Sequence, residues 1–377
     1  TQLRGLADIA RKYDRNYGHF TTRQNIQYNW IKLEDMPALL GDLAKIEMHG
    51  IQSSGNCIRN TTSDQYAGAA ADEIEDPRVY CEIIRQWSTL HPEFSYLPRK
   101  FKIAVTGAPK DRAAVALHDI GLRLYHNAAG KPGFEVLVGG GQGRTPVVGK
   151  IIREWLEPED MLSYLEAILR VYNLWGRRDN KFKARIKILV NAMGIDEFRQ
   201  QVEAEWDKIK DTKLHLDQAE IDRIEAYFAP PAYETLPDFS AELAAQAEKD
   251  EAFKKWLRSN TAKHKVPGYV IVNLSLKSRN QPPGDMTAEQ MDATAALADE
   301  YNFGELRVSH RQNLTFTDVR QKDAYELWQK LTALDLATPN IGKVSDIIAC
   351  PGLDYCALAN ARSIPIAERI QQRFEDI

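Results

Sequence analysis

The chain repeats one short segment of its sequence, and this repeat restricts the possible folds more than any other feature. Residues 21–28 (TTRQNIQY) correspond to residues 309–316 (SHRQNLTF), which places Arg23 and Arg311 288 positions apart. The same offset aligns Ile9-Ala10 with Leu297-Ala298, Tyr13 with Tyr301 and Leu43 with Leu331. A period of this length is too long for a solenoid repeat. It predicts a duplicated module with a pseudo-twofold axis and a site between its halves.

Each copy has the pattern of a helix, a strand carrying Arg-Gln-Asn, and a second helix. The strands are predicted from alternating apolar residues, which are Ile26, Tyr28 and Trp30 in one copy and Leu314 and Phe316 in the other. The second helices are expected at about Glu34–Met48 and Gln321–Leu336.

Between the copies lies a stretch with a different pattern, at about residues 51–227. It predicts a strand over Phe101–Thr106, a helix over Asp111–Tyr125 and a strand over Phe134–Val138, followed by a glycine loop and several helices. A linker rich in Pro and acidic residues follows at about residues 229–238, and a strand over Gly268–Leu276 precedes the second copy. Because strands and helices mix without regular βαβ alternation, we expect an α+β fold.

Composition excludes several classes of protein. A formal charge of −4 gives no global attraction to nucleic acid or membrane, and no run of 18 apolar residues is present to span a bilayer. Four cysteines in 377 residues are too few for a disulfide scaffold, which favours a reducing, cytoplasmic setting. The N-terminus has no signal-peptide pattern and lacks Met, so we expect a chain trimmed at both ends.

Two lysines alternate with apolar residues at the start of the predicted strand over Phe101–Thr106. Side chains on a strand alternate between its faces, so Lys100 and Lys102 share a face and repel each other. Such a pair is tolerated on a solvated edge strand, or where an anion lies between the ammonium groups. Arg59 could join them, but the sequence alone cannot bring it near.

Two further segments could bind an anion. The glycines of residues 138–143 (VGGGQG) follow a predicted strand and could expose backbone N–H groups to a ligand, although a plain glycine turn is at least as consistent. The run at residues 176–187 is strongly basic and lies where a helix is expected to begin. Such a run is usually a solvated helix face, but its arginines could pair with a ligand that bears several carboxylates.

Cys350 and Cys356, separated by five residues, form the densest cysteine pair of the chain. Two thiolates are half of the four-cysteine set that normally holds an iron–sulfur cluster. The alternative is two buried structural cysteines. Cys57 and Cys81 stand alone and are better explained as core or pocket-lining residues.

Taken together, these motifs resemble the siroheme-dependent sulfite and nitrite reductases, in particular their hemoprotein component. The resemblance extends over essentially the whole chain. It rests on residues 22–25 (TRQN), 56–60 (NCIRN), 97–102 (LPRKFK), 138–141 (VGGG), 311–313 (RQN) and the pair Cys350 and Cys356.

The resemblance implies a six-electron reduction of sulfite to sulfide, or of nitrite to ammonium, at a siroheme bridged by a cysteine thiolate to a [4Fe–4S] cluster. Arg59, Lys100 and Lys102 match the residues that bind the substrate anion, and Cys350 and Cys356 match cluster ligands. Siroheme carries many carboxylates, and residues expected to bind it are Arg23, Gln27, Arg99, Gly140, Gly141, Arg185, Gln312 and Asn313. No flavin or nicotinamide motif is present, so electrons are expected from a ferredoxin or a flavoprotein reductase.

The resemblance also implies an arrangement of domains. Ferredoxin-like half-repeats are expected at residues 1–50 and 229–342, a siroheme- and substrate-binding domain at 51–228, and the start of a cluster-binding domain at 343–377. The family has a second cysteine pair and a further substrate-binding arginine that these residues lack. We therefore expect two cluster ligands instead of four, and no activity from these residues alone.

Alternatives remain open at this stage. The chain could be a non-catalytic or degenerate tetrapyrrole-binding paralogue, or a phosphate-ligand protein that uses the glycine loop and the basic helix. Between the two substrates, residues 56–60 favour sulfite.

Overall fold

The computed structural model describes residues 1–143, 145–279, 281–357 and 359–374 and divides into two compact units. Unit 1 comprises Thr1–His49, Ala69–Ala71 and Pro231–Ile377, and unit 2 comprises Gly50–Gly68 and Asp72–Pro230. Unit 2 covers nearly the same residues as the predicted siroheme- and substrate-binding domain. The finer division of unit 1 at residue 343 stays a prediction, and residues 358 and 375–377 of that segment lie outside the described part.

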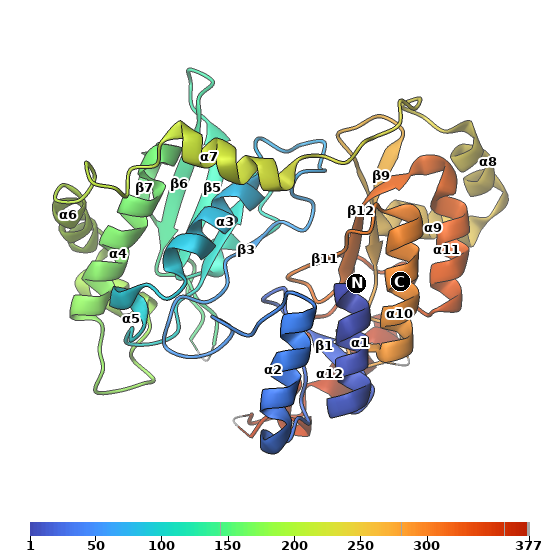
Figure 1. Ribbon diagram of the computed structural model, residues 1–377, viewed down its shortest axis with the longest axis horizontal. Coiled ribbons are helices and arrows are strands. Elements are labelled where there is room, and N and C mark those ends of the chain that lie inside the picture. Colours follow the sequence, from blue (N-terminus) through green and yellow to red (C-terminus); the bar gives the residue numbers. More distant parts are fainter. Residues whose placement is uncertain (144, 280, 358, 375–377) are drawn as a thin grey trace. The chain divides into compact units, whose positions relative to one another are not determined.

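Unit 1 contains two antiparallel sheets (Figure 1). The first has the strand order β10-β1-β2, with bounds Asp285–Thr287, Tyr17–Phe20 and Ile26–Gln27. The second has the order β11-β12-β9-β8, with bounds Arg307–Val308, Leu314–Arg320, Tyr269–Leu274 and Thr261–Lys263. All six residues of β9 are buried, because this strand lies inside its sheet.

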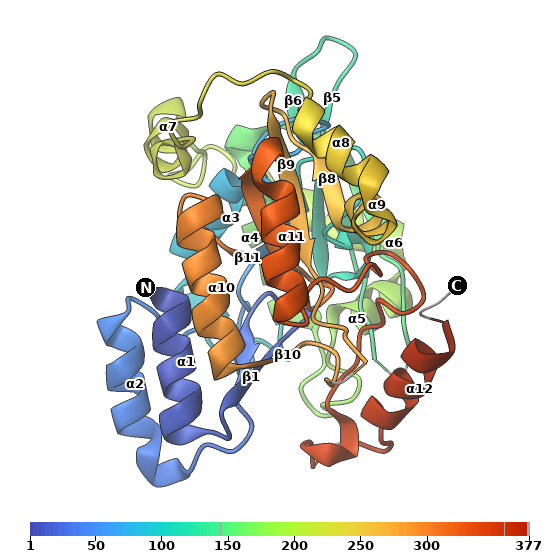
Figure 2. The ribbon, with the colours of Figure 1, turned by 90° about the vertical axis from the view of Figure 1, so that its right-hand side faces the viewer.

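The described part of unit 1 also contains helices. They are α1 (Gln2–Tyr13), α2 (Met36–Lys45), α8 (Ala241–Lys249), α9 (Glu251–Asn260), α10 (Ala288–Tyr301), α11 (Ala324–Ala333) and α12 (Ile364–Phe374). Helix α1 lies beside α10 in both views (Figures 1 and 2). Helix α10 begins with a capping box, in which Thr287 and Gln290 satisfy each other's backbone N–H groups. The core of unit 1 joins residues of both copies of the repeat, among them Phe20 and Phe316.

The structure confirms the duplication at the predicted offset. The short 3-10 helices η1 (Leu33–Asp35) and η6 (Gln321–Asp323) coincide when shifted by 288 residues, and so do α2 and α11. The predicted position of Arg-Gln-Asn on a strand is wrong, because both copies place it in the turn between two strands. In these turns the Thr21 N–H donates to Asn25 O, and the Ser309 N–H to Asn313 O, each at 2.8 Å.

Both turns require a left-handed backbone at their glutamine. The φ angles are 57° at Gln24 and 60° at Gln312, a region that residues other than glycine seldom adopt. The same unusual conformation at equivalent positions shows that the two turns share one geometry and not only a similar sequence.

Unit 2 is built around a mixed five-stranded sheet of order β3-β4-β5-β6-β7 (Figure 1). Its strands are Thr62–Ser63, Ile103–Thr106, Ile120–His126, Pro132–Val138 and Lys150–Leu156. The first three are parallel and the last three antiparallel. Its helices are α3 (Pro77–Ser88), α4 (Met161–Trp175), α5 (Ile186–Met193), α6 (Ile195–Trp206) and α7 (Gln218–Glu225), and together with the sheet they form one hydrophobic core.

The helix predicted over Asp111–Tyr125 is wrong. The structure has a short 3-10 helix, η3 (Val115–Leu117), followed by β5. Ala114 has a φ of 53°, which interrupts a helix, and β5 pairs with β4 on one side and β6 on the other. The helix-forming alanines of this run are therefore overridden by sheet pairing.

The edge-strand interpretation of Lys100 and Lys102 is also wrong. Strand β4 begins at Ile103 and lies inside the sheet, with all four residues buried. Both lysines precede it, in a segment that forms only a bridge between Phe101 and Ile58. The alternative explanation, a nearby anion, therefore gains support.

Candidate functional site

Two segments that are distant in sequence lie side by side in unit 2. The Leu97 N–H donates to Asn56 O at 2.8 Å, the Phe101 N–H to Cys57 O at 3.0 Å, and the Arg59 N–H to Phe101 O at 2.8 Å. This backbone pairing places Arg59 next to the segment that carries the predicted Arg99 and Lys100. The pairing joins positions about forty residues apart, so sequence patterns could not reveal it.

A buried carboxylate lies at the centre of this region. Asp119, directly before β5, has no exposed surface. The Arg185 Nη2 donates to its two carboxylate oxygens at 2.7 and 2.8 Å, and the Lys102 backbone N–H donates to it at 2.9 Å. Burial raises the pKa of Asp119, whereas Arg185 and Lys102 lower it. Asp119 could not be predicted from the sequence, because a single acid before a strand has no distinguishing pattern.

Positive charge exceeds negative charge around Asp119. Burial lowers the pKa of Lys100, and the charges of Arg185, Arg59 and Arg99 lower it further, which shows that these four cations are neighbours. Arg59 is held by the carbonyl oxygens of Ser53 at 2.7 Å and Gly55 at 3.0 Å.

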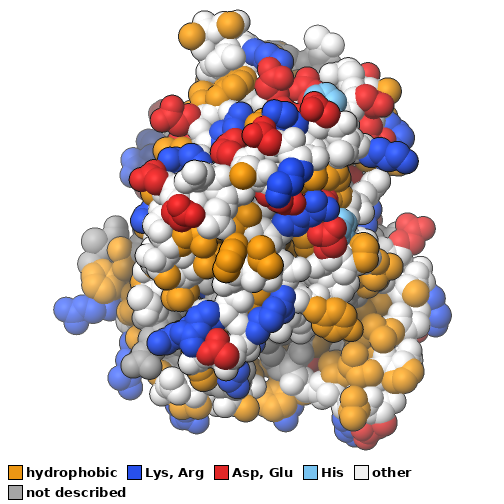
Figure 3. Space-filling model, turned by 90° about the vertical axis from the view of Figure 1, so that its left-hand side faces the viewer, with side chains coloured by type: hydrophobic (Ala, Val, Ile, Leu, Met, Phe, Trp, Pro, Cys, Tyr) orange, Lys and Arg blue, Asp and Glu red, His pale blue; other side chains and the backbone are white. Residues whose placement is uncertain are grey.

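Two of these four cations have no partner among the residues that the structure describes. Within the described part of the chain, the side chains of Arg99 and Lys100 form no hydrogen bond or ion pair. The local excess is not a property of the whole surface, because one face of the molecule shows Lys and Arg mixed with Asp and Glu (Figure 3). The cluster therefore fits an anionic ligand with more than one negative group.

The glycine loop adjoins the same cluster. A Cβ atom on Gly140 would lie 2.5 Å from the carbonyl oxygens of both Ala116 and His118, so only glycine fits there. A Cβ atom on Gly141 would lie 3.2 Å from the Arg185 Nη2. The loop can thus approach both the backbone before Asp119 and the guanidinium that binds it.

The loop presents carbonyl groups to a buried lysine. The Lys187 Nζ donates to the carbonyl oxygens of Gly141, Gln142 and Thr145 at 3.4, 3.1 and 2.5 Å. The Gly141 N–H is used in a bond to Val147 O at 2.9 Å. The Gly141 N–H is therefore not free to bind a ligand, contrary to the expectation for this loop. Lys187 holds the loop in place.

The remaining predicted cofactor residues lie in unit 1. Arg23 is half-buried in the first-copy turn, and Gln27 is exposed on β2, where its Nε2 donates to Asn29 Oδ1 at 2.6 Å. Gln312 and Asn313 are buried in the second-copy turn. The Asn313 Oδ1 accepts from Leu276 N at 3.1 Å, and its Nδ2 donates to Asp346 Oδ1 at 2.8 Å.

The second-copy turn also contains a buried ion pair. The Lys277 Nζ donates to the carbonyl oxygen of Arg311 at 2.6 Å and to Asn313 Oδ1 at 2.9 Å, and it lies 3.3 Å from Asp346 Oδ1. Both charged side chains are fully buried. Burial lowers the pKa of Lys277 to about 8, although Asp346 opposes this shift. The turn is therefore bound to the segment that leads to Cys350.

The predicted cluster ligands lie on one loop of unit 1. Cys350 is exposed and Cys356 half-buried, and both thiols are free. One turn of 3-10 helix, η7 (Gly352–Asp354), separates them, and the Cys356 N–H donates to Gly352 O at 2.8 Å. Two free thiols on a short loop fit the chemistry of an iron–sulfur cluster and supply half of its usual donor set. Across the described residues, no three His, Cys, Asp or Glu side chains converge on a metal position.

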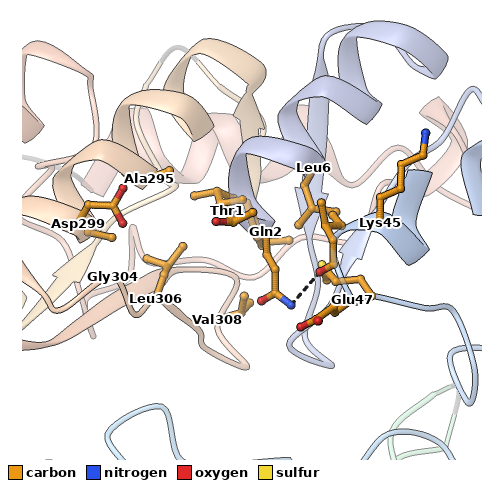
Figure 4. Close-up of a pocket in the computed structure, with 15 residues that line it drawn as sticks. Thr1, Gln2, Leu6, Lys45, Glu47, Ala295, Asp299, Gly304, Leu306 and Val308 are labelled. Carbon is orange, nitrogen blue, oxygen red and sulfur yellow. Dashed lines mark hydrogen bonds between the residues drawn. The ribbon is translucent and has the colours of Figure 1, made fainter. Parts of the chain in front are cut away.

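A separate cavity of about 720 Å³ lies elsewhere in unit 1 (Figure 4). Its wall includes Leu6, Leu306 and Val308. Gln2 and Ile46 also line the cavity, and the Gln2 Nε2 donates to Ile46 O at 3.2 Å. None of the predicted site residues lines it. In the described part of the chain, no helix is long and apolar enough to cross a lipid bilayer.

Comparison with known families gives two matches. A model described as the nitrite and sulphite reductase 4Fe-4S domain matches residues 54–210, which include the cation cluster of unit 2 but not Cys350 or Cys356. A model described as the nitrite/sulfite reductase ferredoxin-like half domain matches residues 1–46 and 268–334, which are the two copies of the repeat.

Individual relatives agree with these matches. The chain is 27% identical to the chloroplastic ferredoxin–nitrite reductase of Arabidopsis thaliana, over 98% of this chain and 59% of that protein. It is 25% identical to sulfite reductase (ferredoxin) 1 of Mycolicibacterium paratuberculosis, over 100% of this chain and 61% of that protein. The chain thus spans about three-fifths of the length of these relatives.

A solved structure shares the fold. The NirA protein of Mycobacterium tuberculosis aligns with a TM-score of 0.78 and 24% sequence identity, over 100% of this chain and 62% of that structure. This likeness agrees with the α+β class and the duplicated module predicted from the repeat.

Proposed function

This chain belongs to the siroheme-dependent sulfite and nitrite reductase family, and from that premise we propose that it supplies the anion-binding part of a site that reduces sulfite or nitrite. The observation that best supports this proposal is the cluster of Arg59, Arg99, Lys100 and Arg185 around the single buried carboxylate of Asp119. The family binds siroheme and a [4Fe–4S] cluster, and both the substrates and the siroheme carboxylates are anions.

Within this cluster the residues divide into two roles. Arg59 and Lys100, with Lys102, would bind the oxyanion and stabilise the charge that develops as its oxygens are removed. Arg99 and Arg185 would pair with siroheme carboxylates, for which the planar guanidinium is suited. Gly140 and Gly141 would let the loop approach the macrocycle. When bound, siroheme and the cluster would carry the electrons of a six-electron reduction from an external donor to the anion.

Lys100 is also suited to donate protons. Its ammonium is half-buried among three guanidinium groups, and burial with these charges lowers its pKa. A lysine whose pKa lies closer to neutrality releases a proton more readily to a reacting oxygen. The reduction consumes several protons, so a donor of this kind next to the bound anion would raise the rate.

The residues of unit 1 complete the proposal. Arg23 and Gln27 would contribute to siroheme binding, and Cys350 and Cys356 would be ligands of the cluster. Gln312 and Asn313 match siroheme-binding positions of the family, although their amide groups are engaged with protein atoms here. Several relatives are named as ferredoxin-dependent, and we propose a ferredoxin as the electron donor.

A visible spectrum tests the cofactor part of the proposal. The chain is produced in cells that make siroheme, and we expect a Soret band together with the far-red band of an isobacteriochlorin. Arg185→Met should lower siroheme retention by roughly tenfold or more, because it removes a charged hydrogen-bond donor. The matched control is Lys131→Ala, a surface residue whose ion pair with Glu157 is about half exposed. Absence of both bands from this chain and from a longer protein that contains it would defeat the siroheme assignment.

A reductase assay separates the enzyme from a degenerate tetrapyrrole-binding paralogue. With reduced methyl viologen as donor, a longer protein that contains this chain and holds both cofactors should consume sulfite or nitrite with six electrons per anion, whereas these residues alone are expected to show no turnover. Siroheme binding without turnover of either anion would favour the non-catalytic alternative, since the cation cluster alone serves both functions.

A further inference from the structure

The amide group of Gln312 is bound to the backbone directly before Cys350. The Gln312 Nε2 donates to Ala349 O at 3.1 Å, and the Ala349 N–H donates to Gln312 Oε1 at 3.0 Å. Gln312 and Ala349 are both buried. Two hydrogen bonds to one residue fix its position and its orientation, and the next residue in the chain is Cys350.

A second group fixes which way the Gln312 amide points. Its Nε2 also donates to His19 Nε2 at 2.9 Å, and the His19 Nδ1 bonds Asp285 Oδ1 at 2.7 Å. This pattern assigns the ring proton to Nδ1, so that Nε2 is free to accept. With the amide turned over, its N–H groups would face the Ala349 N–H, and both bonds to Ala349 would be lost.

The network is part of the fold and not a surface contact. His19 on β1 and Asp285 on β10 are direct partners in the sheet, and both are buried. Gly284 leaves room for the glutamine, because a Cβ atom there would lie 3.1 Å from both the Cβ and the Nε2 of Gln312.

The same turn binds the cysteine loop at a second point. Asn313 and Lys277 both bond the buried Asp346, which lies four residues before Cys350. The chain between Asp346 and Cys350 is therefore fastened at both ends to the second copy of the repeat.

We propose that Gln312, oriented by His19 and Asp285, is a positioning residue that holds Cys350 where it can act as a metal-cluster ligand. This inference rests on the proposed function, because it takes Cys350 as a ligand. The proposed role of Gln312 belongs to the second-copy turn and cannot be deduced from the sequence likeness of the two turns. Partners that orient a metal ligand typically change metal affinity by 10- to 100-fold when they are removed.

Cadmium is a suitable probe, because a soft cation binds a pair of thiolates without needing the assembled cluster. Cd²⁺ is titrated into the reduced chain and followed by thiolate-to-metal absorption, with Cys350→Ser defining the signal of this loop. Gln312→Leu should weaken Cd²⁺ binding by about tenfold. The matched control is Gln24→Leu, the equivalent residue of the first-copy turn, which should leave Cd²⁺ affinity unchanged.

Two further variants keep the test valid if Gln312→Leu folds poorly. Asp285→Asn retains an oxygen that accepts from His19 Nδ1 and should bind Cd²⁺ like the wild type. Asp285→Leu removes that oxygen and should weaken binding in the same direction as Gln312→Leu. Hydrogen exchange of the peptide that contains Ala349 reports whether the loop is released, and we expect roughly tenfold faster exchange in the weakened variants.

The outcomes separate the two proposals. Faster exchange at Ala349 with unchanged Cd²⁺ affinity would show that Gln312 only stabilises the loop, which overturns the inference. Equal Cd²⁺ affinity in wild type and Cys350→Ser would overturn it as well. Weakened Cd²⁺ binding in Gln312→Leu, in a protein that retains no siroheme, would support the positioning role and defeat the proposed function instead.

Discussion

Replacement of Gly140 by alanine tests the geometry on which the candidate site depends. The added methyl carbon would lie 2.5 Å from the carbonyl oxygens of Ala116 and His118. Both clashing atoms belong to backbone that cannot rotate away, because the Gly149 N–H donates to Ala116 O at 2.7 Å and the next residue after His118 is the buried Asp119.

The magnitude follows from this contact and from the unfolded state. Inserting one methyl group into a packed site costs about 1–3 kcal/mol, and a backbone clash belongs at the upper end of that range. Alanine also restricts the unfolded chain, which returns about 0.4–1 kcal/mol. We therefore expect Gly140→Ala to lower the free energy of unfolding of unit 2 by about 2 kcal/mol.

Urea unfolding measures this change. With a slope of about 2 kcal/mol per M, the midpoint of the unit 2 transition should fall by about 1 M. Four of the seven tryptophans report on unit 2, namely Trp87, Trp155, Trp175 and Trp206. The control is Gly41→Ala in α2, where an added Cβ meets nothing within 4 Å and helix propensity should improve by about 0.5–1 kcal/mol.

The variant should also disturb function. Moving His118 displaces Asp119 and therefore the guanidinium of Arg185, so siroheme retention should fall together with stability. A midpoint within about 0.2 M of the wild type would refute the packing argument, because a shift of that size corresponds to less than about 0.5 kcal/mol.

Four other predictions concern charge. Lys277→Met leaves Asp346 buried without its cation and should destabilise unit 1 by about 3–5 kcal/mol in urea unfolding. The double variant Lys277→Met with Asp346→Leu should recover most of that loss. Equal stability of the single and double variants would contradict this prediction. The pKa of Lys277 is about 8 in the folded protein and 10.5 in its ordinary state, so the unfolded chain keeps this proton to higher pH. The free energy of unfolding should therefore rise between pH 8 and 10.5. This rise should be absent from Lys277→Met. Arg59→Ala should weaken sulfite or nitrite binding to the siroheme-loaded protein by roughly 10- to 100-fold in spectral titrations, and an unchanged affinity would remove Arg59 from the site. In a longer protein that contains this chain and holds both cofactors, Lys100→Met should lower the rate of reduction by about 100-fold with a smaller effect on KM. An equal loss in Lys131→Ala would show that the effect is not specific.

Several features of the site could be predicted because they are local. The residues Arg59, Lys100 and Arg185 lie in short motifs whose charge is visible along the chain, and the structure brings them together around one carboxylate. Asp119, which binds Arg185, was missed because its importance comes from burial and not from any neighbour in sequence. Lys187 was noted only as part of a basic run, and its three bonds to the glycine loop depend on a contact more than forty residues away.

In the fold, too, the elements that depend on local sequence could be predicted and those that depend on distant residues could not. The repeat predicted two equivalent modules, and the structure places α2 and α11 at equal offsets, because a periodic apolar pattern determines a helix locally. The run over Asp111–Tyr125 looked helical for the same local reason, yet β5 formed there because pairing with β4 and β6 buries its residues on both faces. Strand pairing depends on residues far away in sequence, so a pattern within one segment cannot report it.

The sequence by itself determined the duplication, the position of its two Arg-Gln-Asn segments, the spacing of Cys350 and Cys356, and a family resemblance that rests on the order of these motifs. Only the tertiary structure decided what the second-copy turn contacts. In the second copy, Gln312 reaches His19 across 293 residues and holds Ala349 before the cysteine loop. Identical short sequences fold into the same turn because backbone geometry is local, but what a buried amide binds is set by the segments that the whole chain packs against it.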